Sequence, residues 1–441
     1  MRVVRPDLVL TLLAVTAAYA GEPASVPART VRNTAELLTA LDDVHAPATV
    51  RLLAGDYPVL QPLLVPDGVV IEGAGTMATR DGRAEGFADG PTSVIRAAAS
   101  FEGDLVTLGN GSALRGLLIL DQMPDRGAPL RLGNAVAVVS RSAQDRMSAR
   151  IEHCEVVTGG SSGVSPRGPV GHAVVVLTRS PALGTAGDPH SGASVALQVE
   201  DSVVRAQDVA FFVLNFTADS EIDVVLSRNL VSAALIAAAG TSRPQLVSGS
   251  RVRVRSIGNR FHPSPGGMAE FGWMLFGGSS PHLQAPDTPG PRNNVLRMES
   301  SGDRIEGFRI GILAAGARRR IEGSGPLYDN RAELDLSDLA IAAPDRDALG
   351  VALHGAISGT GLVDDPGFPA GERNQLTVRM TSVRFEGPPG LNRYSANFGD
   401  SSDDASAGTN RLVIAGSVDR FRIENPGLPS PPAHDFESAA R

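Results

Sequence analysis

A histidine and an aspartate stand two residues apart in the segment Asp188-Pro189-His190-Ser191. An imidazole and a carboxylate at this spacing can remove a proton from a bound molecule and return it, which is general acid–base chemistry. The surrounding segment is rich in glycine and proline, where an ordinary turn also produces such a pattern. Asp188 and His190 are therefore candidate catalytic residues, with a turn that has no chemical role as the alternative.

His354 and Arg309 form a second candidate pair. His354 ends the apolar run Gly350-Val351-Ala352-Leu353, and an alternating pattern sends its side chain to the outer face of a strand. Arg309 precedes a similar run. At an outer face, the histidine would transfer a proton and the arginine would bind a carboxylate. His172 lies at the start of another such run, and we assign it a structural role.

Three aspartates, Asp400, Asp403 and Asp404, lie in a segment rich in glycine and serine. Carboxylate oxygens are the ligands that Ca²⁺ prefers, so these residues are candidate metal ligands, although acidic surface loops are common and the spacing fits no EF-hand. The single cysteine, Cys154, is expected to be a buried thiol, because no cationic group in its neighbourhood indicates a lowered pKa. No other cofactor is indicated.

The elements that must position these side chains are short strands. Nine units repeat a strand, a small polar turn and a β-branched or aromatic residue, and their anchor residues are 27 (Val204 to Val231) to 47 (Val157 to Val204) residues apart. This spacing is typical of a solenoid whose coils carry corner-loop insertions, whereas a β-sandwich would place strands at regular intervals of about 8–12 residues. The units end at Leu118, Val157, Val204, Val231, Phe261, Ile305, Ala340, Phe385 and Phe421.

The turn inside each unit is expected to use left-handed backbone, which glycine, asparagine and aspartate tolerate best. This interpretation accounts for Gly116, Asn229, Asn259, Asp303, Asp338 and Asp419, and Val383 departs from it.

A single helix is predicted from Asn33 to about Asp43. Asn33 can accept a hydrogen bond from a free N–H of the first turn while Glu36 reaches back. Leu37, Leu38 and Leu41 share one face of this helix. One amphipathic helix ahead of a ladder of strands fits a cap over the end of a solenoid, where an exposed edge would aggregate.

Each unit is followed by a second, apolar strand. The alternating pattern predicts one set of side chains inside the coil and the other on its outer face, where it forms an apolar stripe. Packed loops or a partner can cover such a stripe. The predicted inner set is Val209, Phe211, Trp273, Leu275, Ile312, Val351 and Leu353, and the outer set is Ala210, Phe212, Met274, Phe276, Leu313, Ala352 and His354.

The helix, Gly55-Asp56-Tyr57, Ile71-Glu72-Gly73-Ala74-Gly75 and the alternating units resemble the pectin-lyase-like superfamily over residues 30–425. The resemblance implies an all-β, right-handed parallel β-helix. That superfamily holds lyases, hydrolases, epimerases, esterases and non-catalytic spikes, so the fold does not choose a reaction. The segment Asp188-Pro189-His190 is also similar to a signature of mannuronan C5-epimerases, which implies proton transfer by His190, although Ser191 replaces the final aspartate.

Composition bounds the partners. The net charge is −8, all 40 basic residues are arginine, and aromatic residues make up 4% of the chain. Nucleic acid is therefore not an expected partner, because its binding needs a broad positive field. Arg2 and Arg5 precede the apolar run Leu8–Ala18, which ends in Ala18-Tyr19-Ala20. This is the pattern of an export signal, and no later run is long enough to insert into a membrane.

The predicted organisation is a signal peptide at 1–20, an N-terminal segment with the capping helix at 21–45, a parallel β-helix at 46–425 and a loose tail at 426–441. We expect an exported protein, periplasmic or secreted, that binds or processes a polysaccharide by lyase, hydrolase or epimerase-like chemistry. The alternative is a non-catalytic cell-envelope or surface protein that uses its apolar strand face for assembly. An oligomer is compatible with either hypothesis.

Overall fold

The computed structural model describes most of the chain between residues 27 and 437, and all structural statements below concern these described residues. They are 27–98, 101–121, 133–142, 145–159, 163–165, 168–178, 191–241, 247–265, 269–280, 290–319, 325–342, 344–345, 347–358, 371–387, 393–398, 409–416 and 436–437. The predicted signal peptide therefore lies outside the described residues, as do Asp188, His190, Asp400, Asp403, Asp404 and Asp419.

One face of the molecule is a 13-stranded sheet, called sheet A here. Its strands pair in sequence order and all pairs are parallel. The strands are β1 (Ala28–Val31), β2 (Ala48–Leu52), β5 (Val69–Glu72), β10 (Ser112–Arg115), β13 (Arg146–Glu152), β18 (Ser194–Glu200), β20 (Glu221–Ser227), β22 (Arg251–Ile257), β25 (Val295–Ser301), β29 (Arg331–Ser337), β33 (Gln375–Thr381), β36 (Arg411–Gly416) and β37 (Phe436–Glu437).

The 18-stranded sheet, called sheet B, consists of two columns of stacked strands. The first column is β3 (Gly55–Val59), β8 (Ser93–Ala97), β11 (Leu117–Asp121), β14 (Glu155–Thr158), the start of β19 (Val203–Asn215), the start of β21 (Leu230–Ala238), β23 (Arg260–His262), β26 (Arg304–Glu306), β30 (Ala340–Ala342) and β34 (Arg384–Glu386). The second column is β4 (Leu63–Val65), β9 (Val106–Leu108), β12 (Val136–Val139), β17 (Val174–Thr178), the ends of β19 and β21, β24 (Phe271–Ser280), β27 (Ile310–Arg319), β31 (Leu349–Ser358) and β35 (Arg393–Phe398).

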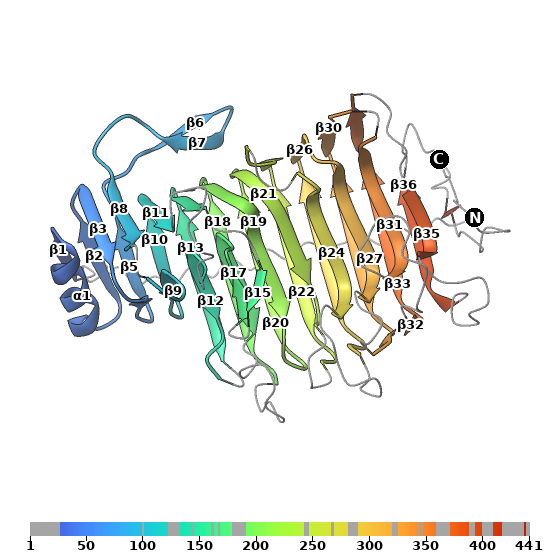
Figure 1. The fold of residues 1–441 in the computed structure, drawn as a ribbon, viewed down its shortest axis with the longest axis horizontal. Helices are drawn as coiled ribbons and strands as arrows, with labels where there is room; N and C mark the ends of the chain where they lie inside the picture. The colour runs from blue at the N-terminus through green and yellow to red at the C-terminus, as the bar shows by residue number, and fades with distance from the viewer. Residues whose placement is uncertain are drawn as a thin grey trace, which may run out of the picture.

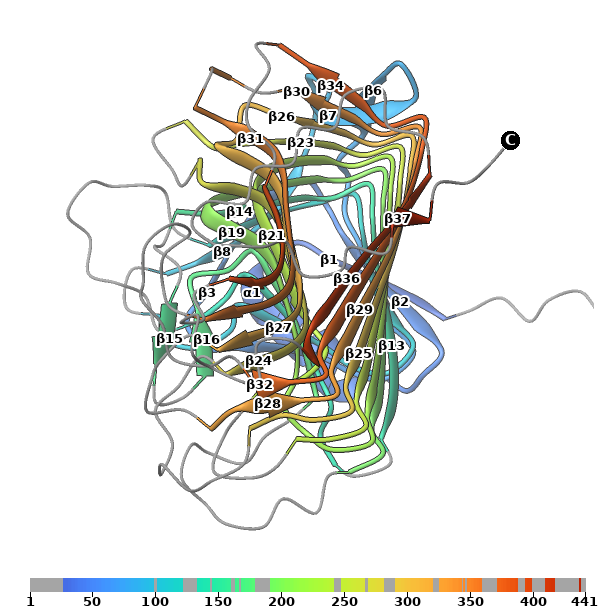
Figure 2. The same ribbon diagram turned by 90° about the vertical axis from the view of Figure 1, so that its right-hand side faces the viewer.

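From β2 to β33, each coil has a strand in sheet A and strand segments in both columns of sheet B, so the chain forms a right-handed parallel β-helix. Figure 1 shows the coils stacked from the N-terminal to the C-terminal end, and Figure 2 shows the sheets enclosing one interior. A continuous core of buried apolar side chains extends from Val31 to Ile414. The predicted fold is confirmed, and the eight described repeat units each end in a strand of the first column.

The predicted helix is confirmed as α1 (Thr34–Asp43), which lies at the N-terminal end of the coils (Figure 1). The Asn33 side chain accepts a hydrogen bond from the Glu36 N–H at 2.9 Å, and Glu36 Oε2 accepts one from the Arg32 N–H at 2.8 Å. Leu37 and Leu41 are buried, and Leu38 packs against the same core. No helix in the described part of the chain is long and apolar enough to cross a membrane.

The sharp corner between sheet A and the first column differs from its prediction. Gly116 and Asp338 do have positive φ, but in three other units the left-handed residue is the one before the expected position: Arg228, Gly258 and Gly302. Ser382 has this conformation ahead of Val383, which explains the apparent exception.

Asn229, Asn259 and Asp303 instead point into the corner and form a ladder. The Asn229 N–H donates to Asn259 Oδ1 at 2.8 Å, and the Asn259 N–H donates to Asp303 Oδ1 at 2.6 Å. These side chains are buried and satisfy buried amides of the preceding coil. Their physical role is hydrogen bonding between coils rather than tolerance of left-handed backbone.

A second ladder, which the sequence did not predict, stands at the opposite end of the sheet A strands. Asn294, Asn330 and Asn374 are buried, and each side-chain oxygen accepts the N–H of the corresponding residue one coil earlier. Sheet A is therefore held at both ends by buried amides, and its strands from β18 to β33 are all seven residues long. This regularity aligns the outward side chains of successive coils in straight rows.

An antiparallel hairpin, β6 (Met77–Arg80) and β7 (Arg83–Phe87), projects along the solenoid axis in Figure 1. Its Arg83 side chain donates hydrogen bonds to the carbonyl oxygens of Gly258 at 2.6 Å and Gly302 at 3.3 Å. The hairpin thus joins an early coil to the corner of later coils. Two further small sheets each contain two strands. One is the antiparallel pair of β15 (Gly163–Ser165) with β16 (Gly168–Val170), and the other is the parallel pair of β28 (Leu327–Tyr328) with β32 (Gly371–Glu372).

Candidate functional site

The outer face of the second column carries the predicted apolar stripe. Met274, Phe276, Leu313 and Ala352 form a cluster separate from the interior core, while Phe212 packs against it. Phe276 and Leu313 are each only 2% exposed. The stripe from Met274 to Ala352 is therefore buried within the single chain.

The predicted inner and outer sets hold except at β19. Phe211, Trp273, Leu275 and Ile312 lie in the interior core as expected. Ala210, predicted to point out, packs in that core instead of Val209, because the register with β21 shifts on both sides of Val209. A bulge inserts a residue into one strand and reverses the alternation locally, which a strict period of two does not anticipate.

His354 and Arg309 are not brought together. His354 lies within β31, opposite Ala315 of β27, and is 2% exposed. Arg309 immediately precedes β27, six residues before Ala315, and pairs with Glu270 at 2.9 Å. The strand rise places them about 20 Å apart, so they do not act together on one group of a ligand, and the separate role of each stays a prediction.

His172 is buried between Asn134 and Phe212. Its Nδ1 lies 3.1 Å from Asn134 Oδ1, and its ring lies 4.4 Å from the Phe212 ring. Burial lowers the pKa of His172 to about 3, because a desolvated imidazolium is unfavourable. A neutral, enclosed imidazole agrees with the structural role assigned from the sequence.

Cys154 is also enclosed, and desolvation raises the pKa of its thiol to about 12. The thiol is therefore protonated and inaccessible at neutral pH, as expected. In the described residues, no group of three or more histidine, cysteine, aspartate or glutamate side chains is arranged to hold a metal ion. The catalytic role of Asp188 and His190 and calcium binding by Asp400, Asp403 and Asp404 stay predictions.

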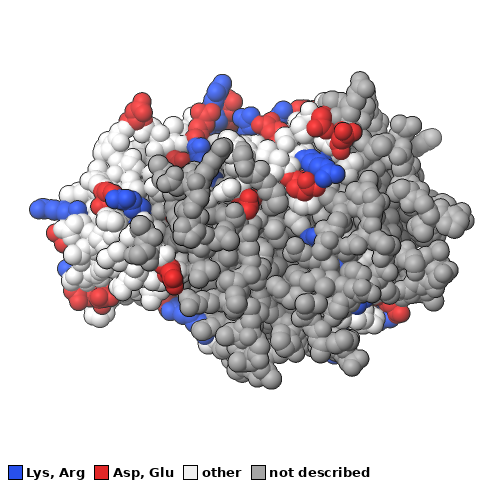
Figure 3. Space-filling view, in the orientation of Figure 1, with Lys and Arg blue, Asp and Glu red and all other residues white. Residues whose placement is uncertain are grey.

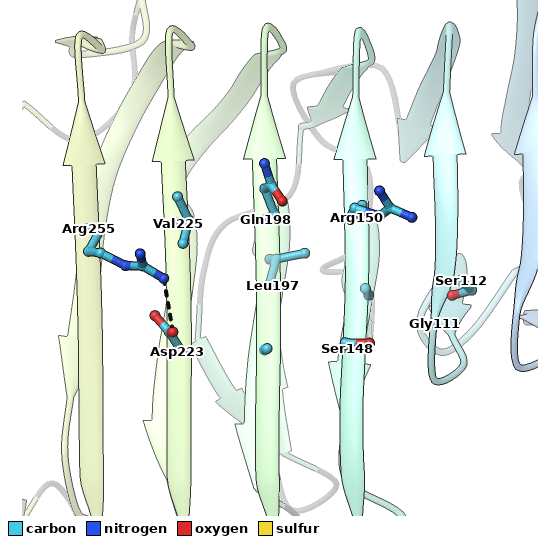
Figure 4. Close-up of a pocket in the computed structure, with 11 residues that line it drawn as sticks. Gly111, Ser112, Ser148, Arg150, Leu197, Gln198, Asp223, Val225 and Arg255 are labelled. Carbon is cyan, nitrogen blue, oxygen red and sulfur yellow. Dashed lines mark hydrogen bonds and ion pairs between the residues drawn. The ribbon is translucent and has the colours of Figure 1, made fainter. Parts of the chain in front are cut away.

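A hollow of about 390 Å³, lined by both polar and apolar side chains, lies on the outer face of sheet A. It crosses five neighbouring strands, β10, β13, β18, β20 and β22, and Figure 4 shows these strands side by side with the lining side chains above them. Four strand steps correspond to a length of about 19 Å along the solenoid axis. This hollow is the candidate functional site.

The shape of the hollow follows from two rows of outward side chains. Gly111, Ser148 and Ala196 occupy one row on three successive strands, and their small size lowers the surface. The adjacent row carries Arg150, Gln198, Val225 and Arg255, whose longer side chains form a wall. Asp223 closes the row of small residues at one end.

The charged side chains of the hollow come from β13, β20 and β22. On β22, Arg255 Nη2 lies 3.1 Å from Asp223 Oδ2 of the adjacent β20, the pair marked in Figure 4. On β13, Arg150 lies 3.5 Å from Glu152, whose other oxygen is 2.6 Å from Arg115 Nε. The hollow therefore presents two guanidinium groups and one lining carboxylate.

The sequence pattern favoured the outer face of the second strand, where His354 was expected, and did not predict this site. The sequence does contain an indication of the hollow, because Ser148 and Ala196 stand at equivalent outward positions of two strands that are each seven residues long. Loop insertions of uneven length between the coils hide that equivalence.

Figure 3 shows the face of the molecule opposite sheet A. Along its upper edge, arginine and acidic side chains of the described residues are intermingled.

No protein-family model and no curated protein matches this chain. Solved structures with a similar course of the chain include tailspike protein 2 of Escherichia coli O157:H7 bacteriophage CAB120, at 10% identity and a TM-score of 0.45, covering 87% of this chain and 40% of the tailspike. A polygalacturonase from Erwinia carotovora has 12% identity and a TM-score of 0.40, with 93% and 100% covered. The A-module of a mannuronan C-5 epimerase from Azotobacter vinelandii has 13% identity and a TM-score of 0.36, with 84% and 96% covered.

The chain spans less than two thirds of the length of the tailspikes that it matches. At these identities the likeness concerns the fold alone. The strand pairing itself defines the class: this molecule is a right-handed parallel β-helix protein.

Proposed function

We propose that this chain is an exported β-helix protein that binds a polysaccharide in the hollow of sheet A. The observation that carries the proposal is the shape and lining of the hollow, which is open and elongated, crosses five stacked strands and combines polar and apolar side chains. A compact apolar ligand requires a deep, enclosed cavity, whereas an extended hydrated chain fits a long open groove. The predicted signal peptide supports an extracellular partner of this kind.

Hydrogen bonds rather than ring stacking would hold the ligand. None of the described residues that line the hollow is aromatic, whereas Ser148, Gln198, Asp223 and the two arginines supply donors and acceptors for hydroxyl groups. Such contacts are individually modest in water, so we expect an affinity that grows with chain length.

Processing of the polysaccharide is a separate proposal, and it is assigned to the predicted residues Asp188 and His190. Among the described residues, one carboxylate, Asp223, lines the hollow, whereas glycoside hydrolysis uses two carboxylates facing each other across the bond. The alternative hypothesis of assembly through the apolar stripe requires an open surface, and the stripe is buried.

Filling the hollow tests the binding proposal. Ala196 lies in the middle of the row of small residues, so Ala196→Trp is expected to abolish measurable binding of long polysaccharides in affinity electrophoresis. Thr377→Trp is the matched control, because Thr377 occupies the same outward row on β33, outside the hollow. Unchanged circular dichroism for both variants establishes folding. Equal binding by wild type and Ala196→Trp would exclude the hollow as the site.

A further inference from the structure

Two arginines, Arg150 and Arg255, line the hollow of a protein whose net charge is −8. An acidic protein repels anionic polymers at long range, so local guanidinium groups at a binding surface act against the overall field. How readily such a guanidinium group binds a ligand depends on how closely neighbouring carboxylates already pair with it. Three arginines of the same face allow a direct comparison.

Arg253 has two short contacts to its carboxylate partner, more than either arginine of the hollow. It lies on β22, two residues from Arg255 and outside the hollow, and one of its nitrogens contacts both carboxylate oxygens of Glu299, at 2.8 and 3.0 Å. Its positive charge is directly matched by one carboxylate.

Arg255 is only partly engaged. It contacts Asp223 through Nη2 and Oδ2 alone, while Arg255 Nε and Asp223 Oδ1 are buried without hydrogen-bond partners in the structure. A two-point arginine–carboxylate pair would satisfy both atoms. The pair is therefore incompletely satisfied, and 37% of the Arg255 side chain is exposed, so its guanidinium group can bind a further anionic partner.

Arg150 is also weakly engaged. Its contact with Glu152 is 3.5 Å, while Arg115 holds the same carboxylate at 2.6 Å. Close to half of the Arg150 side chain is exposed. Glu152 is thus shared between two arginines, and Arg150 retains donors for a ligand.

Arg150 and Arg255 lie in one outward row, with Gln198 and Val225 between them. Three strand steps separate the two strands by about 14 Å along the solenoid axis. That separation exceeds one sugar ring and suits anionic groups on different units of one chain. A polymer that contacts both arginines must run along the axis and cross the strands.

We propose that this hollow selects a polyanionic polysaccharide, whose acidic groups bind Arg150 and Arg255 while the chain crosses β13, β18, β20 and β22. The inference rests on the proposed function and adds the ligand's charge and direction. The shared chemistry is a singly charged oxyanion, which a uronate carboxylate or a sulfate ester can supply. Guanidinium groups bind both.

The test compares four long probes in affinity electrophoresis: polygalacturonate, alginate, dextran sulfate and neutral dextran. Wild type is expected to bind at least one anionic probe and to bind neutral dextran about tenfold more weakly or not at all. Retention by the uronates alone, or by dextran sulfate alone, identifies the source of the oxyanion, and either supports the proposal.

Arg150→Gln with Arg255→Gln is expected to weaken binding of the anionic probe by about tenfold or more, and Arg253→Gln, the matched control, by less than about twofold. Added salt should reduce wild-type affinity more than that of the double variant. Equal binding of dextran and the anionic probes, with the double variant unchanged, would overturn this inference but leave the proposed function standing. Absence of all binding in wild type would instead overturn the proposed function.

Discussion

The outer faces of sheet A and of the second column of sheet B are built from the same parallel strand pairing, but their outward side chains differ in charge, size and burial. On sheet A, outward positions carry arginines paired with carboxylates, such as Arg253 with Glu299, and small residues that leave a hollow. On the second column, Phe276 and Leu313 are buried in an apolar cluster. In a solenoid, the composition of a side-chain row therefore decides whether a face is open to a ligand or sealed.

The largest expected effect is on the sealed face. Leu313→Asp places a carboxylate in the buried stripe without a charged partner, which is expected to destabilise the protein by roughly 3–5 kcal/mol or to prevent folding. Thr377→Asp, at an outward position of sheet A, is expected to change stability by about 0.5 kcal/mol or less. Thermal unfolding of both variants measures the difference. Similar melting temperatures would contradict the assignment of one face as sealed and the other as open.

A smaller, pH-dependent effect is expected at the corner that bounds sheet A. Asp303 is buried at the end of the first ladder, and desolvation raises its pKa from 3.8 to about 6. The folded state therefore favours the protonated carboxyl. Its contribution to stability is fully present below about pH 4 and is lost as pH rises to about 6, a change of order 2–3 kcal/mol.

Asp303→Asn keeps an oxygen that can accept from the Asn259 N–H and carries no charge. Its stability relative to wild type is expected to increase between pH 4 and pH 6 and then to stay constant. Urea unfolding at a series of pH values measures this change. A constant difference across the range would show that the Asp303 carboxyl does not titrate with a raised pKa in the folded protein.

Local sequence patterns predicted the elements well, because their causes are local. Asn33 and Glu36 define the start of α1, and alternation places Trp273 and Leu275 inside the coil. The ladders were not predicted, because asparagine is common both in left-handed turns and as an inward amide, and only the neighbouring coil distinguishes the two. At Asn229 the left-handed residue proved to be the preceding Arg228.

The candidate site was not predicted for a related reason. Ser148 and Ala196 are 48 residues apart in the sequence, and only the register between β13 and β18 makes them neighbours. His354 and Arg309 show the opposite error, since strands that are adjacent in the fold hold them far apart along the strand direction. The alternation of side chains along a strand predicts the face on which a residue lies, but a functional site also depends on the position of that residue along the strand.

Site-specific labelling tests the central claim, that the ligand lies in the hollow of sheet A. The only native cysteine, Cys154, is buried with a thiol pKa of about 12, so Ser148→Cys and Thr377→Cys each introduce one accessible thiol in the same outward row. A saturating bound polysaccharide is expected to slow maleimide modification of Ser148→Cys, inside the hollow, and to leave Thr377→Cys unaffected. Unchanged modification of Ser148→Cys at saturation would contradict the account.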